Sequence, residues 1–172
     1  MNSWASRVMN LLLRSMNIKN SLKKFGKGFG YAFSGLWRCI RTQRNMRFHI
    51  GAAGAVAALA AICNVSRSEV LALMLTVGGV LALETVNTAI EYTVDLACKG
   101  ERSEKAGAAK DCAAGAVLVF CFGAVGVACA VFLTRINEIF AYFADKPAAV
   151  IAAAVYAALW FCWVFVCFNG EK

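Results

Sequence analysis

The sequence has 172 residues, of which 60% are hydrophobic and 16% charged, and its formal net charge is +8. Soluble domains have about 45–50% apolar and ~25% charged residues, so this composition excludes an ordinary soluble domain. Because about 20 consecutive apolar residues are enough to cross a bilayer as a helix, the chain is expected to be an integral membrane protein.

The N-terminal segment, residues 1–47, holds ten of the 18 Lys and Arg residues and no Asp or Glu. Its apolar residues recur at spacings of three or four, which is typical of an amphipathic helix lying in a membrane interface. A nucleic-acid-binding tail is the alternative, but an apolar stripe ahead of membrane spans favours the bilayer over nucleic acid. The longer stripe is Leu22, Phe25, Phe29, Phe33, Leu36, Trp37 and Ile40, and the shorter one is Trp4, Val8, Leu11 and Leu12.

Four membrane spans are predicted, at residues 46–65, 70–96, 106–133 and 147–168. The apolar cluster near the N-terminus is too short for the core of a signal peptide. Cationic residues number 10, 1, 4, 2 and 1 in the five segments outside the spans, with Lys110 counted in the central loop. The positive-inside rule therefore predicts a multi-pass cell-membrane protein with the N-terminus, the 97–110 loop and the C-terminus in the cytoplasm.

The eight cysteines fall mostly within the predicted spans and form no CxxC pair. We interpret them as small buried hydrophobic residues rather than as metal ligands. His49 is the only histidine, which leaves little room for catalysis by a histidine-activated nucleophile.

The second predicted span carries four polar residues on one helical face: Glu84, Asn87, Glu91 and Asp95. If the span begins near Val70, Glu84 lies about 21 Å into a hydrocarbon core of ~30 Å, on its cytoplasmic side. A charged side chain there costs about 2.5–3.5 kcal/mol, so it indicates a functional site. The alternative is a polar network that packs helices together, and for Asp95 a solvated helix end fits equally well.

The third predicted span opens with Lys110 and Asp111, followed by small residues at 113–116 that allow close helix packing. A Lys-Asp pair at a helix start is usually a solvated end. Its proximity to an acidic stripe within the membrane favours a functional role.

Two runs carry a specific resemblance to a known family. Residues 84–95 read Glu-x-x-Asn-Thr-Ala-Ile-Glu-x-x-x-Asp, and residues 109–111 read Ala-Lys-Asp. Together with residues 30–36 and 44–49 they resemble the prokaryotic diacylglycerol kinase and undecaprenol kinase family. The resemblance covers roughly residues 22–133 and leaves the fourth span outside.

The resemblance implies an all-α transmembrane bundle with an interfacial amphipathic helix and three family spans, to which this chain adds a C-terminal one. It divides the chain into cytoplasmic surface helices (1–45), a three-span kinase core (46–133), and a loop with the extra span (134–172). It also implies a homotrimer with composite sites at the cytoplasmic surface, which use magnesium-ATP to phosphorylate a lipid hydroxyl.

The same resemblance implies a role for each matching residue. Glu84 resembles the catalytic base and Glu91 a magnesium ligand, while Asn87 and Asp95 orient the site. The residues expected to contact ATP are Lys110 at the phosphates, Asp111, Tyr31, Lys24 in place of a frequent arginine, Glu91 and, weakly, Glu101.

One departure bears on catalysis, because Gln43 stands where the family has a second metal-binding glutamate. An amide still offers a carbonyl oxygen to magnesium but adds no charge. This departure leaves open a catalytically weak paralogue. Four short spans with a buried glutamate also leave open a small proton-coupled exporter, and a purely structural membrane protein is the third alternative. The runs Asn-Thr-Ala-Ile-Glu (87–91) and Arg-Asn-x-Arg-x-His (44–49) favour undecaprenol as the substrate, and diacylglycerol stays open as an alternative.

Overall fold

The computed structural model describes residues 3–99, 101 and 103–167, and of the first 19 side chains it describes those of Trp4 and Arg7. Every regular element in these ranges is helical, and four segments are long and apolar enough to cross a membrane. The predicted all-α transmembrane bundle is therefore confirmed. The elements are α1 (Ser3–Thr42), α2 (Arg44–Ile62), α3 (Arg67–Cys98), α4 (Glu104–Phe132), the 3₁₀ turn η1 (Leu133–Arg135), α5 (Ile136–Asp145) and α6 (Pro147–Phe165).

Residues 1–38 form the first of two units, and their described part belongs to α1. Every side chain from residue 20 to residue 38 is exposed, so the longer apolar stripe lies uncovered as far as Trp37. A helix with an uncovered apolar stripe and lysines on its other faces is suited to a membrane surface. Of the shorter stripe, Trp4 is exposed, and the side chains of three members lie outside the described set: Val8, Leu11 and Leu12.

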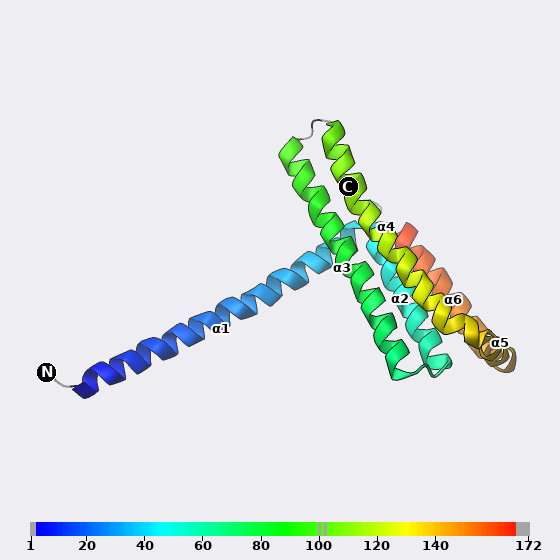
Figure 1. Ribbon diagram of the computed structural model, residues 1–172, viewed down its shortest axis with the longest axis horizontal. Coiled ribbons are helices and arrows are strands. Elements are labelled where there is room, and N and C mark those ends of the chain that lie inside the picture. Colours follow the sequence, from blue (N-terminus) through cyan, green and yellow to red (C-terminus); the bar gives the residue numbers. More distant parts are fainter. Residues whose placement is uncertain (1–2, 100, 102, 168–172) are drawn as a thin grey trace. The chain divides into compact units, whose positions relative to one another are not determined.

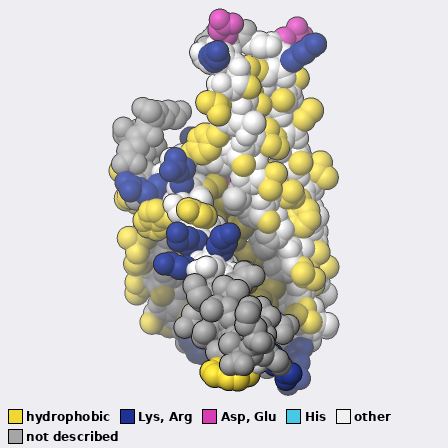
Figure 2. Space-filling model, turned by 90° about the vertical axis from the view of Figure 1, so that its left-hand side faces the viewer, with side chains coloured by type: hydrophobic (Ala, Val, Ile, Leu, Met, Phe, Trp, Pro, Cys, Tyr) yellow, Lys and Arg dark blue, Asp and Glu magenta, His cyan; other side chains and the backbone are white. Residues whose placement is uncertain are grey.

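The second unit, residues 39–172, is built on the antiparallel hairpin of α3 and α4 (Figure 1). Helix α2 packs against α3, α6 packs against α2, and α5 contacts both α2 and α6. Because α3 has 32 residues and α2 has 19, α3 is longer by roughly 20 Å at 1.5 Å per residue. The far end of the hairpin therefore projects beyond the start of α2, and Figure 2 shows charged side chains gathered at that end and hydrophobic ones along its sides.

The start of α3 is fixed by a capping box and an ion pair. The Ser66 hydroxyl accepts the backbone N–H of Glu69, and the Glu69 carboxylate accepts the backbone N–H of Ser66. The same carboxylate accepts two N–H groups of Arg135, at 2.9 and 3.0 Å. Since Arg135 lies in η1, this bidentate pair ties the start of α3 to the end of α4.

The observed helices differ from the predicted spans by a few residues at their ends. The fourth span begins at Pro147 as predicted, and its predicted end at Phe168 lies outside the described residues. Residues 134–146 were expected to form a loop but contain α5. The reason is a helical spacing of apolar side chains in that segment: Ile136, Ile139, Phe140 and Phe143.

The cysteines are less buried than expected. Of the eight, Cys39 and Cys63 are buried and two are half-buried, while four are exposed: Cys112, Cys129, Cys162 and Cys167. Thin helices that contact one or two neighbours leave much of their apolar surface facing outward, and in a membrane lipid covers such surface. The interpretation of all eight as buried residues is therefore wrong.

Candidate active site

Polar side chains of α3 are buried in the second unit. Glu84, Asn87 and Thr88 are 2%, 5% and 4% exposed. The Thr88 hydroxyl donates to the backbone carbonyl of Glu84 at 2.9 Å and lies 3.2 Å from the Cys39 sulfur. The Glu84 carboxylate accepts no hydrogen bond from the described residues. A buried carboxylate without a donor is costly, which favours a group that meets a ligand or a proton over one that only packs helices.

The Glu91 carboxylate joins α3 to the junction of α1 and α2. One of its oxygens accepts a hydrogen bond from Nδ2 of Asn87, and the other accepts one from Nε2 of Gln43, both at 3.2 Å. Gln43 is the N-cap residue of α2 and has an extended backbone, with φ −102° and ψ 116°. Beside it, the Thr42 and Tyr92 hydroxyls lie 3.0 Å apart. The chain therefore bends at Gln43, which lets the Gln43 side-chain amide reach Glu91.

Further along the hairpin, Lys110 of α4 donates to the Asp95 carboxylate of α3. The pair is partly exposed, with side-chain exposures of 34% for Lys110 and 64% for Asp95. An exposed pair of this kind contributes little to stability, because solvent screens it. Its importance is positional, because it holds an ammonium group over the same helical face as Glu91.

An open pocket of about 520 Å³ lies where α2, α3 and α4 meet, and we call it the Glu84 pocket. Glu84 and Asn87 enter it from α3, and the exposed Asp111 enters it from α4. Its other polar groups come from the start of α2. The lining residues are Asn45, Phe48, His49, Glu84, Asn87, Asp111, Ala114, Gly115, Val117, Leu118 and Cys121.

The donor set around Glu91 fits a magnesium ion in part. In the part of the chain that the structure describes, no three His, Cys, Asp or Glu residues are grouped to hold a metal. The Asn87 Oδ1 atom, however, is buried and has no hydrogen-bond partner. Rotating an amide by 180° exchanges its oxygen and nitrogen, so Gln43 and Asn87 can each turn a carbonyl oxygen towards a cation. Magnesium accepts one or two carboxylates completed by neutral oxygens, and Glu91 with these two amides meets that need.

The remaining predicted site residues lie elsewhere. Lys24 and Tyr31 belong to the first unit, where both side chains are exposed. Glu101 lies in the connection between α3 and α4; its side chain is exposed, and its backbone N–H donates to the Cys98 carbonyl at 2.8 Å. Seven of the ten predicted positions lie in the polar contacts of the hairpin and the start of α2. Gln43, Asn87 and Glu91 are hydrogen-bonded, Glu84 and Asp111 share a pocket with Asn87, and Asp95 pairs with Lys110.

The three residues that α2 contributes to the Glu84 pocket had no role assigned from the sequence: Asn45, Phe48 and His49. They follow the bend at Gln43 at helical spacing, so one face of α2 presents all three to α3. The signal that could have found them is this spacing within residues 44–49, read together with the position of the bend.

Comparison with known proteins agrees with this geometry. The sequence pattern of the family described as "Prokaryotic diacylglycerol kinase" matches residues 30–132. The chain is 40% identical over 122 residues to a protein of Bacillus subtilis (strain 168) named "Undecaprenol kinase", covering 71% of this chain and 98% of that protein. It is 42% identical over 97 residues to a "Diacylglycerol kinase" of Synechocystis, covering 56% of this chain and 55% of that protein.

No solved structure matches the chain. The family match ends at residue 132, so it includes the polar face of α3 and the start of α4 but excludes α5 and α6. The chain therefore belongs to the prokaryotic diacylglycerol kinase family and is a membrane-bound lipid kinase.

Proposed function

We propose that this protein transfers the γ-phosphoryl group of ATP to the hydroxyl group of a membrane lipid, at the cytoplasmic face of the membrane. The observation that carries the proposal is the Glu84 carboxylate, which is 2% exposed, lacks a hydrogen-bond donor and lines an open pocket. A carboxylate in such a place can take the proton of a hydroxyl whose lipid chain keeps it within the membrane.

In this mechanism Glu84 accepts the hydroxyl proton while the lipid oxygen attacks the γ-phosphorus of ATP, the bond from that phosphorus to the bridging oxygen breaks, and ADP leaves. Phosphoryl transfer otherwise depends on positioning and on neutralising charge. Lys110, held by Asp95, approaches the ATP phosphates, and Asp111 contacts the nucleotide. The family resemblance also implies ATP contacts at Lys24, Tyr31 and Glu101. Glu91 with Gln43 and Asn87 would hold Mg²⁺, which supplies neutralising charge at the phosphates.

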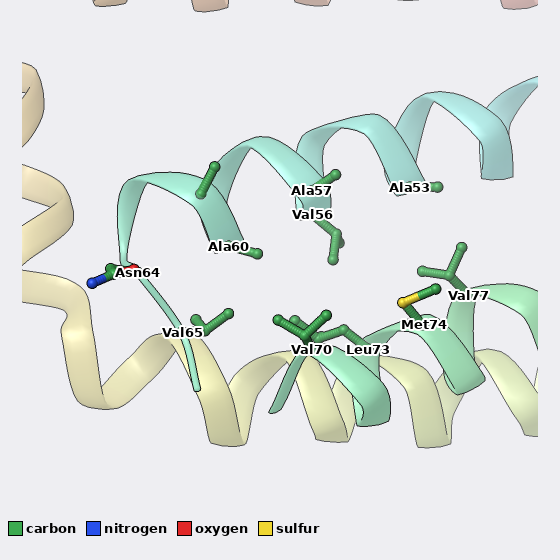
Figure 3. Close-up of a pocket in the computed structure, with 11 residues that line it drawn as sticks. Ala53, Val56, Ala57, Ala60, Asn64, Val65, Val70, Leu73, Met74 and Val77 are labelled. Carbon is green, nitrogen blue, oxygen red and sulfur yellow. The ribbon is translucent and has the colours of Figure 1, made fainter. Parts of the chain in front are cut away.

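The Glu84 pocket continues into apolar space that suits a hydrocarbon chain. A neighbouring pocket of about 230 Å³ shares Phe48, His49 and Cys121 with it. A third pocket, of about 380 Å³, shares four residues with the second: Ala53, Val56, Leu73 and Val77. Figure 3 shows this third pocket between α2 and α3, lined by aliphatic side chains from both helices. We call the second and third pockets together the apolar groove and propose that it takes the lipid chain while the hydroxyl stays near Glu84.

Undecaprenol is the substrate we propose first. The relative named undecaprenol kinase matches this chain over 98% of its own length, whereas the match to the named diacylglycerol kinase covers 55% of that protein. Diacylglycerol is the second candidate, because the family pattern carries that name.

The proposal also includes a cytoplasmic N-terminus and assembly as a homotrimer. Cationic residues concentrate in residues 1–47 and around the α3–α4 connection, which supports a cytoplasmic N-terminus. The homotrimer implied by the family resemblance is part of the proposal. Chemical cross-linking in native membranes tests it, with a trimer expected as the largest abundant product.

The test of function is phosphate transfer from radiolabelled ATP by the purified full chain, with undecaprenol and diacylglycerol in separate reactions. We expect a labelled lipid from undecaprenol, and we expect Glu84→Gln to lower the rate by about 10²–10⁴-fold, the usual contribution of a general base. The matched control is Glu138→Gln, an exposed glutamate of α5, which should keep the wild-type rate. Absence of a labelled lipid from either substrate would favour the catalytically weak paralogue.

A further inference from the structure

Helix α6 lies beyond the family match yet makes specific contacts with α2. Its contact face consists of Tyr156, Trp160 and Val164, which are four residues apart and so lie on one side of the helix. The Tyr156 hydroxyl donates to the Gly51 carbonyl at 2.6 Å. A Cβ atom built on Gly51 would lie 2.0 Å from the Trp160 ring, so only glycine at this position lets the indole approach α2.

Trp160 also supports a wall of the Glu84 pocket. Its ring packs against that of Phe48, with the centroids 5.1 Å apart, and Phe48 lines the pocket together with Glu84. Helix α6 therefore supports Phe48 from the side away from the pocket. Without the indole, Phe48 can move away from the lipid site.

Arg47 connects the end of α6 to the bend between α1 and α2. The side chain is 2% exposed and donates to the carbonyls of Ile40 and Arg41, in the last turn of α1, at 3.2 and 3.0 Å. It also donates to the carbonyl of Val164, in the last turn of α6, at 3.3 Å. Carbonyl groups at helix C-termini have no partner within their own helix and attract cations. One buried guanidinium thus donates hydrogen bonds to the C-terminal carbonyls of two helices.

The bend that Arg47 holds is the one that carries Gln43 to Glu91. Residues 40–48, which we call the elbow, contain the carbonyls bound by Arg47, the amide bound to Glu91, and Phe48. Helix α6 therefore reaches the site by two routes, through Arg47 to Gln43 and through Trp160 to Phe48.

We propose that α6 is a positioning element of the kinase site, which holds the elbow against α3 through Arg47 and Trp160. The inference rests on the proposed function, and it assigns a role to a helix that the family match leaves out. Neither Arg47 nor Trp160 touches the substrates in this assignment; both act through Gln43 and Phe48.

The test compares four single variants of the purified full chain. Arg47→Lys keeps the charge but loses the fork that spans two helices, and Trp160→Ala removes the ring against Phe48. Trp160→Phe keeps a ring, and it costs no hydrogen bond because the buried Trp160 Nε1 has no acceptor among the described residues. The matched control is Leu159→Ala, on the exposed face of α6.

We expect Arg47→Lys to lower kcat about tenfold with the KM for ATP within twofold of wild type. Trp160→Ala should raise the KM for the lipid about fivefold or more, and Trp160→Phe should restore it to within twofold. Amide hydrogen exchange in residues 40–48 should be at least tenfold faster in Arg47→Lys and Trp160→Ala, and unchanged in Leu159→Ala.

Unchanged exchange in the elbow of both variants would overturn the inference, and so would faster exchange with wild-type kinetics. Equal effects of Leu159→Ala and Trp160→Ala would reduce α6 to a general contribution to stability and would also overturn it. If the wild-type chain phosphorylates no lipid, the proposed function fails, while the exchange measurement still decides whether α6 holds the elbow.

Discussion

Replacing Gln43 by glutamate tests how the site handles charge. In the structure, the Gln43 amide donates to one Glu91 oxygen at 3.2 Å. Gln43→Glu removes that hydrogen bond and brings two carboxylates together at this separation. Their repulsion at 3.2 Å is about 1 kcal/mol with the dielectric constant of water and ~5 kcal/mol at an effective value of about 20. Since Glu91 is half-buried, we expect a loss of stability of about 1–3 kcal/mol without divalent cations.

Magnesium should reverse this loss, because a cation between two carboxylates turns repulsion into binding. A ligand at 100 times its Kd stabilises the folded state by about 2.7 kcal/mol. Thermal unfolding of the purified wild type and variant, in chelator and in millimolar Mg²⁺, measures both effects. We expect Gln43→Glu to have the lower Tm in chelator and the larger rise with Mg²⁺. Equal rises in the two proteins would refute the assignment of Glu91 and position 43 to one metal site.

Three further predictions follow from other parts of the chain. Val56→Trp should fill the apolar groove and raise the KM for the lipid about tenfold at an unchanged KM for ATP, whereas Val155→Trp, on the exposed face of α6, should change neither in a steady-state assay. Glu69→Gln should lower the free energy of unfolding and the denaturant midpoint, since a neutral amide weakens the bidentate bond to Arg135; denaturant titration measures this, and an unchanged midpoint would contradict it. Cys39 should react with N-ethylmaleimide at least tenfold more slowly in the folded protein than in the denatured chain, as followed by mass spectrometry at pH 8, because it is 2% exposed and burial raises the pKa of its thiol; equal rates would show that the contact with Thr88 opens readily.

The sequence was sufficient for the membrane spans because hydropathy is a local property. It was also sufficient for the shared face of Glu84, Asn87 and Glu91, since offsets of 3 and 7 within one helix determine their direction. The α5 helix was missed because its ten residues are too few to resemble a span. The exposure of four cysteines was missed because burial depends on how many neighbours a helix has.

Contacts between distant segments could not be predicted from the sequence. The hydrogen bond from Gln43 to Glu91 joins residues 48 positions apart and requires the bend at Gln43 to lie at one height along α3. The role of Arg47 depends likewise on where α6 ends, 117 positions later. Arg47 is a charged residue within the first predicted span, and the structure explains it as the group that binds the carbonyls at two helix ends.

The most direct test of the central claim asks whether Glu84 removes the proton from the lipid hydroxyl. Single-turnover phosphoryl transfer is measured for the wild type and Glu84→Gln, with the ordinary lipid alcohol and with an analogue whose hydroxyl is made more acidic by neighbouring fluorines. A more acidic hydroxyl needs less help from a base, so the loss caused by Glu84→Gln should shrink at least tenfold with the analogue. An equal loss with both alcohols would contradict the assignment of Glu84 as the base.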